Sequence, residues 1–154
     1  DPTNYDARAN LMWAGTHAIN GVVGEGCSPA WCIHPMEHEL SAFYDITHGE
    51  GLAILTPAWM EYILNDETKG YIAQFARNVF DIKGETEMEE AKAGIEALRK
   101  FFFKEMGMPK NLREVGITDQ SNFEIMAQKA SKPCARSFVS LSKEDIINIY
   151  KKAF

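Results

Sequence analysis

Three histidines in one short stretch are the residues best suited to do chemistry. His34 and His38 are separated by Pro-Met-Glu, and His48 follows ten residues later, ahead of Gly-Glu-Gly. The fourth histidine, His17, stands alone on an apolar segment and is interpreted as a structural residue. Histidine is the commonest metal ligand, and its unperturbed pKa lies close to neutrality. The cluster therefore predicts a metal site or a proton-transfer site.

Helical geometry limits how these histidines can meet. On one continuous helix, which rises about 1.5 Å per residue, His34 and His48 would lie about 21 Å apart, whereas metal–nitrogen bonds are about 2 Å long. If the two share an ion, the chain must turn back between them. Residues 45–47, with Thr47 as a possible helix cap and glycines at 49 and 51, are a plausible place for that turn.

Spacing alone favours a different pair. His34 and His38 are four residues apart and share one face of a regular helix, although Pro35 disturbs the first turn. The same stretch matches the inverted zinc-protease motif, in which two histidines bind zinc and the glutamate between them, here Glu37, activates a water. That interpretation needs a third, distant carboxylate, for which Glu114 is available, and such proteases are mixed α/β proteins. Three ordinary surface histidines are the remaining alternative.

The acidic neighbours of the cluster have expected roles as well. Glu37 and Glu39 flank His38 on other faces of a helix, and we expect solvated side chains there. Asp45 could either accept a hydrogen bond from a ligand imidazole or cap a helix.

Composition narrows the class of protein. A formal net charge of −6 without a Lys/Arg cluster argues against a nucleic-acid partner, and no apolar run is long enough for a membrane span. Three cysteines, an odd number without zinc-finger spacing, indicate reduced thiols in a cytoplasmic protein. The chain opens on Asp-Pro-Thr-Asn, with no signal peptide and no initiator methionine, which is typical of a segment from a longer polypeptide. We expect one domain over residues 1–154 and a small-molecule substrate.

The elements that must position the histidines are predicted to be helices throughout. Apolar residues recur at spacings of three and four, and no strand-like alternation occurs. The sequence predicts an all-α bundle of about seven helices. The first three predicted helices cover residues 5–23, a stretch from Ser28-Pro29 or from after Pro35 to near Asp45, and residues 48–62 or beyond. A fourth opens at 65–67, with Tyr71, Ile72, Phe75, Val79 and Phe80 expected to be buried, and a fifth runs from the Thr86-x-x-Glu89 capping box to 107–109. The last two start at Ser121-x-x-Glu124 and at Ser142-x-x-Asp145, and the final helix runs to Phe154.

Several segments resemble the iron-containing (group III) alcohol dehydrogenases, and within them the butanol dehydrogenase branch. The likeness covers nearly the whole chain in order. It is carried by residues 5–14, 20–21, 31–34, 38–42, 44–54, 57–60, 101–103, 107–109 and 141–150. This resemblance implies the helical C-terminal domain of such an enzyme, with a dehydroquinate synthase-like fold. A dinucleotide-binding domain would precede it in the complete protein.

The resemblance also implies roles for the histidines. His34 and His48 would be two ligands of a divalent metal, Fe²⁺ or Zn²⁺, whose other ligands are an upstream Asp-x-x-x-His pair. His38 would lie near the nicotinamide of NAD(H) or NADP(H) as the catalytic histidine. The implied reaction is hydride transfer between a primary alcohol, such as butanol, and its aldehyde, in a homodimeric enzyme.

The family pattern and the bare spacing thus disagree about the second ligand, and the turn at 45–47 favours the family pattern. The upstream pair and any glycine-rich phosphate loop are missing from this sequence. We therefore expect the chain alone to be inactive. A non-catalytic helical interaction module is an alternative from a different class.

Overall fold

The computed structural model describes residues 1–26 and 31–154. The predicted helix start at Ser28-Pro29 and the thiol of Cys27 lie outside the described residues. The chain divides into two compact units, residues 1–30 and 31–154. Within the described part, seven α-helices and no β-strand occur, so the predicted all-α class is confirmed. No helix there has the length and apolarity that a membrane span requires.

The first unit consists of α1 (Tyr5–Ile19) followed by a short 3-10 turn, η1 (Val22–Gly24). Asn4 caps α1 by accepting a hydrogen bond from the backbone N–H of Ala7 at 2.9 Å. The prediction of a core helix to Val23 is wrong in two respects: the helix ends at Ile19, and it contains no buried residue. Gly21, at φ 90°, interrupts the helix because this left-handed conformation cannot continue it.

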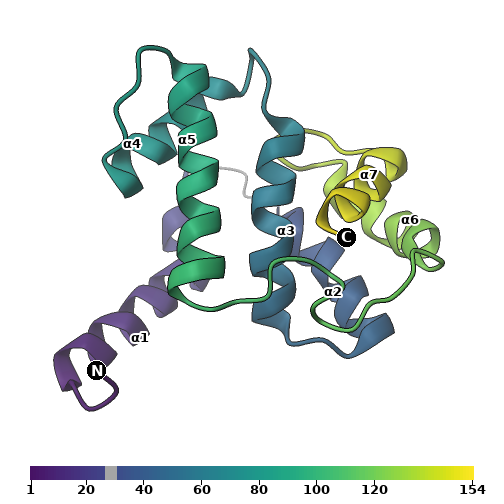
Figure 1. Ribbon diagram of the computed structural model, residues 1–154, viewed down its shortest axis with the longest axis horizontal. Coiled ribbons are helices and arrows are strands. Elements are labelled where there is room, and N and C mark those ends of the chain that lie inside the picture. Colours follow the sequence, from purple (N-terminus) through teal and green to yellow (C-terminus); the bar gives the residue numbers. More distant parts are fainter. Residues whose placement is uncertain (27–30) are drawn as a thin grey trace. The chain divides into compact units, whose positions relative to one another are not determined.

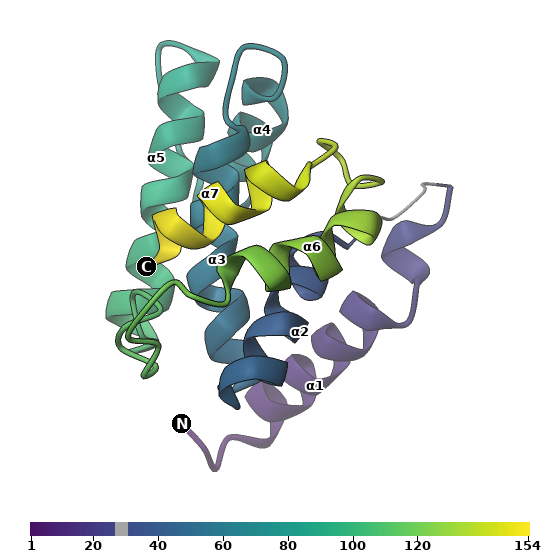
Figure 2. The ribbon, with the colours of Figure 1, turned by 90° about the vertical axis from the view of Figure 1, so that its right-hand side faces the viewer.

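The second unit carries the remaining helices. They are α2 (Ile33–Tyr44), α3 (His48–Ile63), α4 (Lys69–Phe80), α5 (Glu87–Lys100) with its π-helical extension η2 (Phe101–Glu105), α6 (Phe123–Cys134) and α7 (Lys143–Ala153). Helix α3 contacts α2, α5 and α7, while α2 also contacts α6, and α4 packs along α5 (Figure 1). Figure 2 shows α6 and α7 side by side. Because three other helices hold α3 in place, its N-terminal residue, His48, has a fixed position.

The core of this unit is apolar, and helices α2 to α7 all contribute buried residues to it. Its largest fully buried side chains include Tyr150, Phe123, Met36, Leu40 and Ile54. The Tyr150 hydroxyl donates to the backbone carbonyl of Met36 at 2.7 Å, which satisfies a polar group that would otherwise be costly to bury. This bond ties α7 to the helix that carries His34 and His38.

Two cysteines belong to the same core. Cys32 and Cys134 are buried free thiols, and Sγ of Cys134 donates to the carbonyl of Cys32 at 3.3 Å. Burial raises the pKa of Cys134 to about 12, with a smaller contribution from Cys32. Both side chains therefore act as small apolar residues. The prediction of reduced thiols agrees with these two free cysteines.

Helix α4 differs from its predicted packing. Its buried residues are Ile72, Ala73 and Ala76, whereas Tyr71 and Val79 are exposed. The small alanines let α5 approach closely, so they, and not the larger side chains, form the centre of the contact. The prediction is confirmed for Ile72 and holds in part for Phe75 and Phe80, which pack half-buried against the core. It is wrong for Tyr71 and Val79, because helical periodicity does not show which neighbouring face will be small enough to pack.

Candidate metal centre

A tight turn between α2 and α3 brings the histidines together. Asp45 adopts a left-handed conformation, φ 53°, and its N–H closes α2 by donating to the carbonyl of Ser41 at 2.9 Å. Thr47 is extended and serves as the N-cap position of α3, whose first residue is His48. The predicted turn at 45–47 is confirmed. It directs the N-terminal end of α3 back toward the first turns of α2.

The three imidazole rings converge as a result. The ring centroids of His34 and His48 lie 5.4 Å apart, those of His38 and His48 5.5 Å, and those of His34 and His38 6.0 Å. The rings of residues fourteen positions apart are thus as close as those of residues four apart. Imidazoles at these distances can offer nitrogens to one ion or to one reacting oxygen.

The rings differ in environment. His38 is exposed, the side chain of His48 is about half exposed, and His34 is partly buried beneath Trp31, whose ring packs edge-on at 4.4 Å. Desolvation lowers the pKa of His34, and the neighbouring His48 and His38 lower it further, against an opposing effect of Glu37. The neutral imidazole that results is the form that binds a metal.

Glu37 lies beneath this cluster and is completely buried. Its Oε2 pairs with Nδ1 of His48, and its Oε1 accepts a hydrogen bond from the Ser41 hydroxyl. The expectation of a solvated Glu37 is therefore wrong. The reason is the close approach of α3 at Gly51, where a Cβ would lie only 2.6 Å from Cγ of Glu37. The sequence carries one signal for this contact, since Glu37 and Ser41 are four residues apart and share one face of the helix.

Glu39 and Asp45 take structural positions. Glu39 is partly buried and forms an ion pair with Lys129 of α6 at 3.5 Å, so it too is not simply solvated. Asp45 is exposed at the end of α2. Of its two predicted roles, the structure supports the cap, since the carboxylate next to His48 is that of Glu37.

The donor set fits a divalent transition metal. Glu37, His38 and His48 can each offer one ligand atom, and these atoms lie within 4.8 Å of one another. His34 adds a fourth candidate donor through its ring beside His48. Imidazole nitrogens with a carboxylate suit Zn²⁺ or Fe²⁺. The pair His34 and His48 stays a prediction, because the geometry also brings Glu37 and His38 within reach.

The arrangement does not suit the protease interpretation. Glu37 would have to activate a water between His34 and His38, but its carboxylate is buried and engaged by His48 and Ser41. Glu114, the distant carboxylate that interpretation needed, instead accepts a hydrogen bond from the backbone N–H of Lys110 at 2.8 Å.

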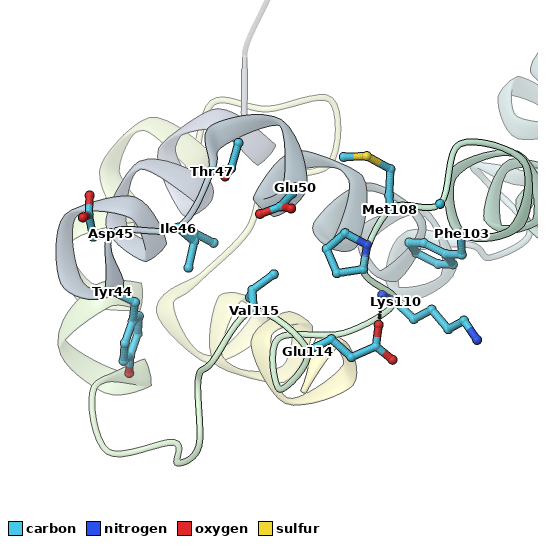
Figure 3. Close-up of a pocket in the computed structure, with 12 residues that line it drawn as sticks. Tyr44, Asp45, Ile46, Thr47, Glu50, Phe103, Met108, Lys110, Glu114 and Val115 are labelled. Carbon is cyan, nitrogen blue, oxygen red and sulfur yellow. Dashed lines mark hydrogen bonds between the residues drawn. The ribbon is translucent and has the colours of Figure 1, made fainter.

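A separate pocket lies beside the α2–α3 turn, with a volume of about 540 Å³. Figure 3 shows Asp45, Ile46 and Thr47 on one side and the chain around Met108 and Glu114 on the other. The histidines are not among its lining residues. It had no signal in the sequence, because residues 103–115 reach the turn only through the tertiary fold.

Comparison with known proteins identifies the family to which the chain is similar. The NADH-dependent butanol dehydrogenase A of Clostridium acetobutylicum is 48% identical over 98% of this chain and 39% of its own length. The NADPH-dependent aldehyde reductase YqhD of Escherichia coli is 38% identical over 79% of this chain and 31% of its own length. The chain thus spans about 40% of the length of the first of these relatives.

A solved structure gives the same result for the fold. The crystal structure of NADH-dependent butanol dehydrogenase A from Thermotoga maritima superposes with a TM-score of 0.83 at 36% identity, covering 99% of this chain and 40% of that one. The family model for the C-terminal part of the Fe-containing alcohol dehydrogenase family matches residues 1–154. The chain therefore belongs to the Fe-containing alcohol dehydrogenase family and corresponds to its C-terminal part.

Proposed function

We propose that this chain is the metal-binding part of an alcohol dehydrogenase that interconverts primary alcohols and aldehydes with NAD(H) or NADP(H). The observation that carries the proposal is the convergence of His34, His38 and His48 in a member of this family. The names of the relatives, an NADH-dependent butanol dehydrogenase and an NADPH-dependent aldehyde reductase, support the reaction class and a small alcohol or aldehyde substrate.

The metal would be held by His34 and His48. When bound, Fe²⁺ or Zn²⁺ supplies Lewis acidity, which favours the polarised carbonyl of an aldehyde or the alkoxide of an alcohol. His34 suits this position because its environment keeps the imidazole neutral. His48 suits it because α3 fixes its backbone at the first helical residue, on the rim of the cluster.

His38 would serve the reaction without binding the metal. Its exposed ring lies 5.5 Å from that of His48, so it can reach a substrate placed at the cluster. An imidazole there can pass a proton to or from the substrate oxygen, or help to place the nicotinamide ring.

The nicotinamide cofactor would be bound mainly by another part of the complete enzyme. The sequence contains no glycine-rich phosphate loop, the element that holds a dinucleotide pyrophosphate. In this proposal residues 1–154 act as one metal-binding domain of a homodimeric enzyme, and the chain alone shows no NADH-dependent reduction of butanal.

Calorimetric titration of the 154-residue chain with Zn²⁺ tests the ligand assignment. A site that lacks its upstream partners should bind with a Kd in the tens of micromolar, or about −6 kcal/mol. His34→Ala and His48→Ala should abolish this binding, whereas His38→Ala should leave it intact. His17→Ala, in the first unit, is the matched control.

Two outcomes would contradict the proposal. Loss of binding in His38→Ala, with retention in His48→Ala, would show that the spacing-based pair is the ligand pair. Submicromolar binding by the unmodified chain would mean that these residues form a complete site by themselves. For the complete enzyme, His38→Ala should keep the metal but lose turnover in an assay of NADH-dependent butanal reduction.

A further inference from the structure

The buried carboxylate of Glu37 is the strongest feature that the proposed roles leave unexplained. It is fully buried, yet within the described part of the chain its ion pairs include no lysine or arginine. Its polar contacts there are Nδ1 of His48 and the hydroxyl of Ser41. A buried carboxylate is costly unless its oxygens are hydrogen-bonded, so these two contacts account for its position.

We infer that Glu37 is a positioning residue, which fixes the tautomer and the ring orientation of His48. An ionised carboxylate only accepts hydrogen bonds, so the proton of a neutral His48 must be on Nδ1, where it donates to Oε2. This leaves Nε2 unprotonated, with its lone pair directed away from Glu37. The inference rests on the proposed function, in which that nitrogen binds the metal.

The surroundings of Glu37 hold it in one place. Ser41, one turn later on α2, donates to Oε1, the oxygen that His48 does not use. Gly51 provides the necessary space, because a Cβ there would lie 2.6 Å from Cγ and 2.8 Å from Oε1 of Glu37. Ser41 on α2 thus holds the carboxylate, which packs against α3 at Gly51. A buried, fixed partner therefore orients the His48 ring, even though about half of the His48 side chain is exposed.

Positioning of this kind strengthens a metal site. Carboxylates that accept the second ring N–H of a ligand histidine orient the ring and raise its basicity, and their loss costs about 10–100-fold in metal affinity. Glu37 could alternatively be a ligand itself, since its oxygens lie near donor atoms of His38 and His48. The two roles make opposite predictions for a glutamine at this position.

Nitrogen-15 NMR of histidine-labelled chain at about pH 8, without metal, reads the tautomer directly. We expect the Nδ1–H form of His48 in the unmodified chain and its loss in Glu37→Ala. Glu37→Gln should retain it, because the amide oxygen can still accept from Nδ1–H. An Nε2–H tautomer in the unmodified chain, or an unchanged tautomer in Glu37→Ala, would overturn the inference.

Zn²⁺ calorimetry on the same variants supplies the second readout. Glu37→Ala should weaken binding about 10–100-fold, with most of the affinity restored in Glu37→Gln. Equal losses in both variants would instead identify Glu37 as a ligand, since an amide is a poor zinc donor. Glu39→Gln is the matched control on the same helix and should change neither readout.

Gly51→Ala provides a variant that leaves Glu37 chemically intact. The added methyl should displace the carboxylate, so the tautomer of His48 should change as it does in Glu37→Ala. This variant decides the matter if Glu37→Ala does not fold. The two experiments also separate failure of the proposed function from failure of this inference. If the chain does not bind Zn²⁺ but His48 is in its Nδ1–H form, the metal site is refuted and the positioning role of Glu37 stands.

Discussion

At the scale of single residues, the cluster depends on one backbone conformation. Asp45 stops α2 in the left-handed region, which most residues avoid but Asp and Asn tolerate better. Three residues later α3 begins with His48, which comes to lie beside His34. A chemistry-bearing cluster therefore rests on an exposed residue that has no chemical role of its own.

This separation of roles predicts the effect of Asp45→Gly. Glycine adopts positive φ without steric cost, so the free energy of unfolding should rise by roughly 0.5–1 kcal/mol, as measured by urea denaturation. Zn²⁺ affinity should stay the same, because the side chain does not contact the histidines. A fall in Zn²⁺ affinity would show that Asp45 orients a ligand, the alternative that the sequence left open. Asp45→Ala, which has to adopt the same φ with a Cβ, should destabilise the chain.

Local patterns in the sequence predicted this turn, whereas the pairing of His34 with His48 was implied by the family resemblance, because spacing alone favoured His34 with His38. Glu37 could not be assigned in the same way. Its burial requires Gly51, fourteen residues later, to face it across two helices, and nothing in the local sequence shows which helix faces will meet. The motif around His38 thus gave the place of the site, but it did not show that the Glu37 carboxylate pairs with His48.

At the scale of elements, capping signals predicted helix starts when the cap was local. The Ser142 capping box of α7 forms completely, with the Asp145 side chain bonded back to the Ser142 backbone. The analogous signal at Ser121 does not form a cap, because its hydroxyl bonds to Asp119 in the preceding turn and Asn122 becomes the N-cap position. A polar side chain with two local partners cannot be assigned from spacing alone.

The close contact between α4 and α5 leaves no room for a side chain larger than glycine at position 94. A Cβ on Gly94 would lie 2.5 Å from Cβ of Ala76, so Gly94→Ala should force the helices apart. We expect a loss of about 1–3 kcal/mol in the free energy of unfolding, despite the better helix propensity of alanine. Urea unfolding followed by circular dichroism measures this change.

Gly70→Ala is the matched control for this prediction. Its Cβ would meet carboxylate oxygens of Glu87 at 3.5 Å, an ordinary contact. This substitution should therefore be neutral or stabilising, by up to about 1 kcal/mol. If both variants lose the same stability, the close approach at Gly94 does not limit the packing of α4 on α5.

At the scale of the whole molecule, the two units contribute unequally to the core. Every residue of the apolar core cluster belongs to residues 31–154. Helix α1 instead exposes Leu11, Met12, Trp13 and Ile19, each by 64–75%. Its apolar sequence predicted a buried helix, but helical periodicity gives only the position of an apolar face and not the surface that would cover it.

This distribution predicts that residues 31–154 fold without the first unit. Because every residue of the apolar core cluster lies within 31–154, removal of residues 1–30 should change the free energy of unfolding of the second unit by less than about 1 kcal/mol. Urea unfolding followed by circular dichroism measures this change. The chain of residues 31–154 should unfold at the same urea midpoint as these residues do within the complete 154-residue chain. Zn²⁺ affinity should also be unchanged, since the converging histidines and Glu37 all lie within 31–154. A shortened chain that unfolds at lower urea, or that loses Zn²⁺ binding, would contradict this prediction and show that the second unit depends on residues 1–30.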